Sequence, residues 1–319
     1  MSPVNPTRRQ TLGLTAVLAG ALSLAACNRG GGEAGAEGGG GGGTVMLSVS
    51  TQTNPFFVQL VDGARKAAEE LGLTLEVQDA SDDASTQANH LQNAITQGVA
   101  CVIVNPTDSD AVSASIEALN AAEIPVIAVD RNATSGELVS YIASDNVAGG
   151  AQAAQALAEA IEDTGQILVL QGVPGASATR DRGQGFTEEI ANHGDIEVVA
   201  EQTANFDRAE GLNVATNLLQ ANPDVVGIFA HNDEMALGAI EALGPRAGSE
   251  VFVVGFDGTG NGLAAVEAGT MHATIAQQPG ELGAQAVEQA QTVVEGGSPE
   301  AEVQVDVVVV TAENVSEYL

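Results

Sequence analysis

Short apolar runs alternate with amphipathic segments along most of this chain, and this alternation restricts the possible folds more than any other feature. In the first half, the strand-like runs lie at 44–50, 73–78, 99–104 and 125–129. The helix-like segments between them lie at 55–72, 84–98 and 110–122, and Pro55 suits a first helical turn. Apolar strands in this order predict a parallel sheet that is covered by helices on both faces.

The same alternation starts again in the second half of the chain. We expect helices at 148–161, 183–193, 208–220, 234–243 and 279–295. We expect strands at 166–171, 197–201, 225–230, 251–256 and 305–310. The sequence therefore predicts an α/β protein with two similar lobes, each built on a parallel sheet.

The N-terminus has the pattern of an export signal. Two adjacent arginines precede an apolar run at 12–26, which is too short to span a bilayer but suits a signal peptide. The run ends in the sequence LAAC (24–27), which resembles a bacterial lipobox. We predict a signal peptide at 1–26 and a lipid on the thiol of Cys27. The arginine pair resembles part of a twin-arginine signal, although ordinary secretion is equally compatible, and a plain signal peptide with an unrelated cysteine is the alternative.

A glycine-rich tract follows the cysteine. Glycine fills all but four positions between 30 and 43. Such a segment cannot pack a core, and as a flexible coil its fourteen residues reach roughly 20 Å. We expect 27–43 to be a lipidated tether, so that the folded body is extracytoplasmic and meets the membrane only through its anchor.

The charge balance excludes one class of partner. The chain has 42 Asp and Glu residues against 10 Lys and Arg, and its formal net charge is −32. A surface this acidic repels phosphate backbones, which excludes a nucleic-acid-binding protein. A gene regulator of the same fold class would also need an N-terminal helix-turn-helix, and the signal and the glycine tract stand there instead.

The sequence has none of the familiar catalytic or metal-binding motifs. Its four histidines are scattered, its two cysteines are too few for a disulfide scaffold, and no Ser-His-Asp set or phosphate-binding glycine loop occurs. An enzyme remains an alternative through its carboxylates, with Asp130 and Asp257 as acid and base. We expect no catalytic residue, no metal and no cofactor.

Polar and aromatic residues follow the predicted strands, where ligands bind in open α/β sheets. Those after the first-half strands are Asn54, Phe56, Phe57, Asn105, Asp130 and Arg131. Those after the second-half strands are Arg182, Phe206, Asn232 and Asp257. Sugar hydroxyls need both donors and acceptors, and the faces of sugar rings pack on flat aromatic groups. This mixture indicates a carbohydrate, although Asn54 and Asn105 could serve only as a helix cap and a turn, and either arginine could form a plain ion pair.

The segment from about 45 to 310 resembles the type I periplasmic sugar-binding family. The matching strings are NPFF (54–57), NPTDSD (105–110), IASDN (142–146), FDR (206–208), NDEMALGA (232–239) and GFDG (255–258). The resemblance implies two Rossmann-like lobes joined by three hinge crossovers, near 144–145, 277–278 and 306. It implies one lobe at 44–144 plus 278–306, and another at 145–277 plus 307–319.

The same resemblance implies the site and the partners. It adds Gln277 to the ten residues above, pairs Asp130 with Arg131 and Asp257 with Arg182 as two grips on hydroxyls, and places the ring between Phe57 and Phe206. It implies a monosaccharide ligand, with D-ribose favoured, and delivery by a monomer to the permease subunits of an ABC importer. The alternatives are allose, galactose, xylose or a furanosyl signal molecule, or a sugar sensor that feeds a chemoreceptor or kinase.

Overall fold

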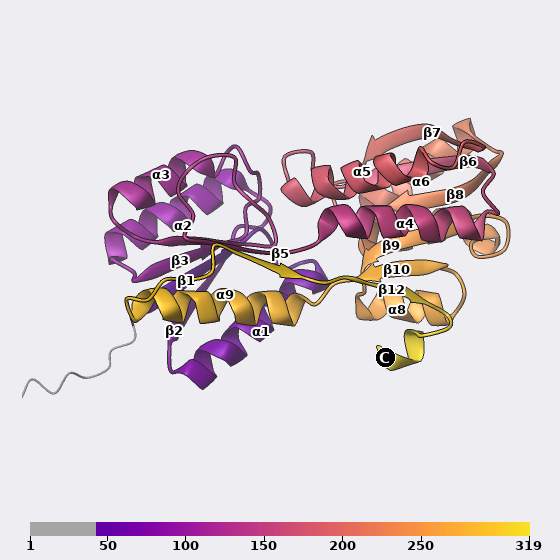
Figure 1. Cartoon of the computed structure of the whole chain (residues 1–319). Helices are drawn as coiled ribbons and strands as arrows, with labels where there is room; N and C mark the ends of the chain where they lie inside the picture. Colours follow the sequence, from indigo (N-terminus) through magenta and orange to yellow (C-terminus); the bar gives the residue numbers. More distant parts are fainter. Residues whose placement is uncertain (1–42) are drawn as a thin grey trace, which may run out of the picture. The chain divides into compact units, whose positions relative to one another are not determined.

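The computed structural model describes residues 43–319. The predicted signal peptide, Cys27 and nearly all of the tether therefore lie outside the described residues. The described part contains two six-stranded sheets with helices on both faces of each (Figure 1). None of its helices is both long enough and apolar enough to cross a membrane.

The first sheet is parallel throughout, with the strand order β11-β5-β4-β3-β1-β2. Its strands are β1 (Thr44–Val49), β2 (Thr74–Asp79), β3 (Cys101–Val104), β4 (Val126–Val129), β5 (Ser140–Ser144) and β11 (Glu302–Val305). Its helices are α1 (Pro55–Leu71), α2 (Ala84–Gln97), α3 (Ser113–Ala121) and α9 (Pro279–Val294). The α1 and α9 helices pack side by side although they are distant in sequence (Figure 1).

The second sheet has the order β12-β10-β9-β8-β6-β7. Its strands are β6 (Gly165–Gln171), β7 (Ile196–Thr203), β8 (Val225–Ala230), β9 (Phe252–Asp257), β10 (Ala273–Ala276) and β12 (Val308–Thr311). Its helices are α4 (Asn146–Ala160), α5 (Ser177–Ile190), α6 (Arg208–Ala221), α7 (Asp233–Leu243) and α8 (Gly260–Glu267), with short 3₁₀ turns η1 (Gly244–Arg246) and η2 (Val315–Glu317). The prediction of parallel strands fails for β12, which runs antiparallel to β10.

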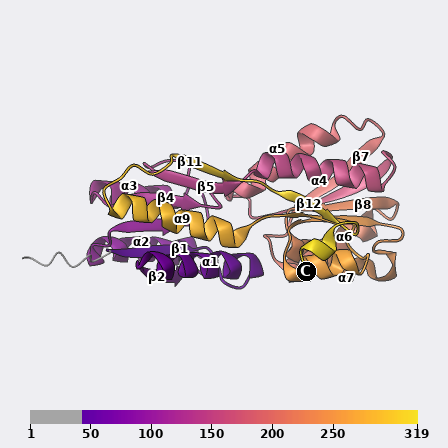
Figure 2. The ribbon, with the colours of Figure 1, turned by 60° about the horizontal axis from the view of Figure 1, so that its bottom comes forward.

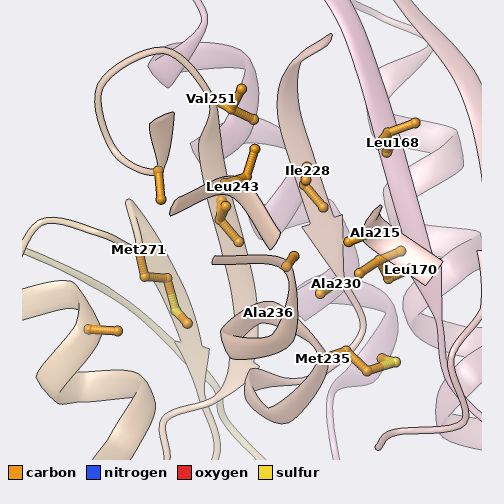
Figure 3. Packing of buried hydrophobic residues seen from close by; sticks show 14 of the residues in the cluster. Leu168, Leu170, Ala215, Ile228, Ala230, Met235, Ala236, Leu243, Val251 and Met271 are labelled. Carbon is orange, nitrogen blue, oxygen red and sulfur yellow. The ribbon is translucent and has the colours of Figure 1, made fainter. Parts of the chain in front are cut away.

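Each sheet has an apolar core on both faces. Figure 3 shows one of these cores, where Leu168, Leu170 and Ile228 from the strands pack with Met235 and Met271. All five side chains are at most 1% exposed. Burial on both faces explains why the strands read as continuous apolar runs in the sequence.

Local signals set the ends of α1. The Oδ1 atom of Asn54 accepts a hydrogen bond from the Phe56 amide at 2.9 Å, and Pro55 occupies the first turn. The helix ends at Gly72, whose φ of +71° is the left-handed conformation that glycine adopts without strain. These caps fix the position of the two phenylalanines in the first turn.

The chain passes between the two sheets three times. It leaves the first sheet after β5, returns to it between β10 and α9, and leaves it again between β11 and β12 (Figures 1 and 2). This arrangement confirms the predicted fold class of two α/β lobes joined by three crossovers.

Two of the predicted elements have wrong bounds, and one of these errors affects the site; three further elements, β5, α8 and β10, were not predicted at all. The run 305–310 is not one strand, because Val305 pairs in β11 and Val308 pairs in β12, in different sheets. An unbroken apolar run does not reveal such a break. Helix α5 begins at Ser177 rather than at 183, so Arg182 lies in a helix and not in a loop. The start of α5 is polar and rich in small residues, which hides its helical period.

Candidate functional site

A pocket of about 240 Å³ lies where loops and helix starts from both sheets meet. The lining residues are Asn54, Phe56, Phe57, Asp130, Arg131, Ala178, Arg182, Phe206, Asn232 and Asp257. The structure thus brings together all the predicted site residues except Asn105 and Gln277. Sequence reasoning missed Ala178, which lies on α5 only because that helix begins early.

Aromatic rings lie beside a guanidinium in the lining of the pocket. The Arg131 guanidinium carbon lies 5.1 Å from the centre of the Phe57 ring and 5.3 Å from the centre of the Phe206 ring. The Phe56 and Phe57 rings meet edge to face at 5.1 Å. Flat apolar surfaces therefore stand next to a planar hydrogen-bond donor.

Asp130 and Arg131 form the first charged pair. The Arg131 Nε atom lies 3.6 Å from the Asp130 Oδ2 atom, and one terminal guanidinium nitrogen donates to the Pro106 carbonyl oxygen at 3.2 Å. Arg131 Nε has no hydrogen-bond partner. A guanidinium carries five N–H donors, so most of those on Arg131 remain available to a ligand.

Asn105 lies behind this pair and orients it. Its Nδ2 atom donates to Asp130 Oδ2 at 2.9 Å, and its Oδ1 atom accepts from the Ser50 amide at 3.1 Å. Asn105 is fully buried and does not line the pocket. Its role in the structure is to hold the carboxylate of Asp130.

Asp257 and Arg182 form the second charged pair. A terminal nitrogen of Arg182 lies 3.5 Å from Asp257 Oδ1 and donates to the His231 carbonyl oxygen at 2.6 Å. The Arg182 guanidinium also stacks on Phe256, 3.8 Å from the ring centre. Gln277 donates from Nε2 to Asp257 Oδ1 at 2.7 Å, so it stands behind Asp257 as Asn105 stands behind Asp130.

The two remaining asparagines cap helices. Asn54 caps α1, which is the alternative role that the sequence analysis gave it. The cap uses its Oδ1 atom and leaves its Nδ2 group free. Asn232 accepts from the Met235 amide at 3.0 Å and donates to the Phe206 carbonyl oxygen at 3.2 Å. Asn232 therefore positions Phe206, while Asn54 keeps donors free at the pocket.

Burial sets the ionisation of the pocket. It raises the pKa of Asp130, although Arg131, Arg182 and Asn105 oppose that shift. It raises the pKa of Asp257 well above its ordinary value, against Arg182. It lowers the pKa of both arginines, against their aspartates. When both carboxylates are ionised, two anions and two cations leave the lining with no net charge but with many polar atoms, which suits a neutral polyhydroxyl ligand.

Three pocket residues have unusual backbone angles. The φ angles of Asp130, Phe206 and Asp257 are +64°, +62° and +119°. Residues other than glycine rarely adopt a positive φ angle. The backbone strain that such angles cause concentrates at functional sites. The surrounding fold thus holds these three side chains in place at a local energetic cost.

Comparisons with known proteins identify the family of this chain. A family model described as "Periplasmic binding protein domain" matches residues 45–298. The chain is 48% identical over 263 residues to the ribose import binding protein RbsB of Escherichia coli, which covers 82% of this chain and 88% of that protein. It is 46% identical to the Bacillus subtilis RbsB, over 79% of this chain and 82% of that one. A solute-binding protein from Actinobacillus succinogenes, solved with bound D-allose, superposes with a TM-score of 0.82 at 34% identity, over 86% of this chain and 100% of that one.

Proposed function

This chain belongs to the periplasmic binding protein domain family, and from that premise we propose that it binds D-ribose in the pocket described above. The observation that carries the proposal is that two buried Asp–Arg ion pairs lie beside aromatic rings. Each pair of ionised groups has no net charge. The choice of ribose rests on the curated relatives at 45–48% identity, which are ribose import binding proteins, whereas the apiose and xylitol binding proteins among the relatives are 33–34% identical. These relatives are binding proteins rather than enzymes, so the enzyme alternative is set aside.

Each lobe contributes a part of the binding set. In our proposal, sugar hydroxyls donate to the carboxylates of Asp130 and Asp257 and accept from Arg131 and Arg182. The ring faces pack against Phe57 and Phe206, in the way that aromatic groups bind flat apolar surfaces. The set is complete only when the lobes at 44–144 plus 278–306 and 145–277 plus 307–319 are closed, so ligand favours the closed state.

The proposal extends to transport. The RbsB relatives are named as import binding proteins, and the solved relative is named as the solute-binding protein of an ABC transporter. We propose that this chain delivers its sugar, as a monomer, to the permease of an ABC importer outside the cytoplasm. A sensor that feeds a chemoreceptor would bind the same sugar, and growth on ribose after deletion of the gene separates the two roles.

A panel of sugars tests the ligand. Calorimetry on the protein without its signal peptide should give the tightest binding with D-ribose among ribose, allose, galactose, xylose and arabinose. The D-allose in the solved relative makes allose the main competitor. Tighter binding of allose would replace ribose as the ligand while keeping the sugar-binding function. Binding of none of these sugars would reject the proposal.

We propose that Cys27 anchors the protein by a lipid. The support is the LAAC sequence at the end of the apolar run, followed by a glycine-rich segment. Labelling of cells with a radioactive fatty acid should mark the parent protein and not Cys27→Ser. Cys101, which is buried in β3, serves as the control, because Cys101→Ser should keep the label. Label that persists in Cys27→Ser would refute the anchor.

A further inference from the structure

Asn146 lies at the junction of a crossover and the pocket. It is the first residue of α4, directly after the chain leaves β5, and its side chain is buried at 3% exposure. It does not line the pocket and was not among the residues predicted from the sequence. Its side chain nevertheless contacts the site through Arg182.

Both ends of the Asn146 amide make buried hydrogen bonds. The Oδ1 atom accepts from Arg182 Nε at 2.8 Å, and the Nδ2 atom donates to the Ser144 carbonyl oxygen at 3.1 Å. Capping of α4 does not need these bonds, because Asp145 accepts from the Ala148 amide at 2.9 Å. A role in the helix start therefore does not explain the side chain of Asn146.

The far end of this link is fixed in the first sheet. Ser144 ends β5 and pairs with Val305 of β11, and the Asp145 amide donates to the Val305 carbonyl oxygen at 3.2 Å. Two crossover strands thus hold the Ser144 carbonyl in place. Asn146 joins that fixed point to an arginine that lines the pocket.

Arg182 depends on this bond for its orientation. Its other polar contacts, to His231 and Asp257, use a terminal nitrogen of the guanidinium. The bond from Nε to Asn146 lies on another edge of the planar guanidinium. Bonds on two edges together prevent rotation of the guanidinium. Loss of the Asn146 acceptor would leave a buried, charged N–H without a partner.

We propose that Asn146 is a positioning residue for sugar binding, which fixes the Arg182 guanidinium relative to the β5 crossover. The proposal rests on the proposed function, since the value of that orientation lies in the hydrogen bonds of Arg182 to a sugar. Asn146 itself makes no contact with the sugar in this account.

Affinity for ribose gives the first test. Asn146→Ala removes the acceptor, and Asn146→Ser leaves only a hydroxyl on a shorter side chain; both should weaken binding by about tenfold or more, as expected for a lost bond to a charged group. Asn146→Asp keeps an oxygen for Arg182 Nε but replaces the donor to the Ser144 carbonyl with a second oxygen, so it should still weaken binding, because the link to the β5 crossover is lost. Asn120→Ala is the control, since it removes two bonds to the backbone of Glu137 far from the crossovers and should bind like the parent.

A double-mutant cycle separates positioning from a general structural role. Lysine lacks the guanidinium Nε–H that donates to Asn146. In an Arg182→Lys background, Asn146→Ala should therefore cause little further loss of affinity. Equal losses in both backgrounds would overturn the proposal, because a merely structural asparagine acts independently of Arg182. Thermal melting of all variants first shows whether each of them is folded.

A measurement without sugar makes the outcome independent of the ligand. The chain has few arginines, so the Nε–H signals can be assigned by NMR with Arg182→Lys. Hydrogen exchange at Arg182 Nε should accelerate in Asn146→Ala and Asn146→Ser but not in Asn146→Asp or Asn120→Ala. Unchanged exchange would overturn the proposal even if ribose binds. Failure of the parent to bind ribose, with accelerated exchange in the variants, would instead reject the proposed ligand alone.

Discussion

At the scale of single residues, the two arginines of the pocket are held in different ways. Arg182 is fixed by bonds from both Nε and a terminal nitrogen, whereas Arg131 makes one bond to a backbone carbonyl and leaves Nε unpaired. Arg131 therefore has more donors to offer a ligand. Its stacking near two aromatic rings keeps the plane of those donors fixed.

The donors of Arg131 lead to the first prediction. Arg131→Lys keeps the charge but loses the planar group, so ribose binding should weaken by roughly 10- to 150-fold, or about 1.5–3 kcal/mol. Arg180→Lys is the control, because Arg180 lies outside the pocket lining and makes only a 3.4 Å bond to Gly175. Calorimetry that shows parental binding for Arg131→Lys would remove Arg131 from the site.

The raised pKa of Asp257 predicts pH-dependent binding. Sugar hydroxyls donate to the ionised carboxylate, whereas burial favours the protonated form in the free protein. Affinity for ribose should therefore fall as the pH falls through the raised pKa, and binding in that range should release a proton. Calorimetry in two buffers with different ionisation enthalpies measures the number of protons that are released on binding.

A neighbouring carboxyl group provides the control for this effect. Burial also raises the pKa of Asp181, which does not line the pocket. Asp181→Asn should keep the parental pH dependence, whereas Asp257→Asn should lower affinity and reduce that dependence to the part due to Asp130, whose pKa is also raised by burial. A binding constant that does not change between pH 8 and the acid limit of folding would contradict the assignment.

The sequence could name the residues of the pocket but not their places within it. Asn105 and Gln277 are of the same chemical type as Asn54, yet they stand behind the carboxylates. The sequence shows only that a polar residue follows a strand. Whether its side chain reaches the ligand or the next side chain depends on packing that no local pattern encodes.

At the scale of elements, the position of Arg182 depends on how closely α4 and α5 approach. A Cβ atom on Gly150 of α4 would overlap the carbonyl oxygen of Arg182 on α5. Glycine at this place lets the two helix backbones come into contact. This contact sets how closely α5 approaches α4 at Arg182 and Phe186.

This contact predicts the effect of a single methyl group. Gly150→Ala should push α5 outward, lower the stability by about 1–3 kcal/mol and weaken ribose binding through Arg182. Gly194→Ala is the matched control, since nothing lies within 4 Å of a Cβ atom there, and its effect should be neutral or slightly stabilising. Thermal melting and calorimetry on both variants check this, and equal behaviour of the two would contradict the account.

At the scale of the whole molecule, ligand should change the arrangement of the lobes. The pocket takes Asp130 and Arg131 from one lobe and Arg182 and Asp257 from the other, so a sugar that contacts all four favours closure. Solution scattering should show a smaller radius of gyration with saturating ribose. A panel sugar that does not bind is the control, and a ribose curve identical to the sugar-free one would count against closure.

The charge of the whole chain leads to the last prediction. Acidic residues outnumber basic ones by 42 to 10, so most carboxylates have no cationic partner, and their mutual repulsion opposes the compact state. Salt reduces that repulsion, because the screening length falls from about 10 Å at 0.1 M to about 3 Å at 1 M. The melting temperature should therefore rise clearly between dilute buffer and molar sodium chloride. Sucrose, which also favours compact states but does not screen charge, should raise it less. A flat or falling curve in chloride, or an equal rise in sucrose, would show that repulsion among the carboxylates does not limit the stability of this protein.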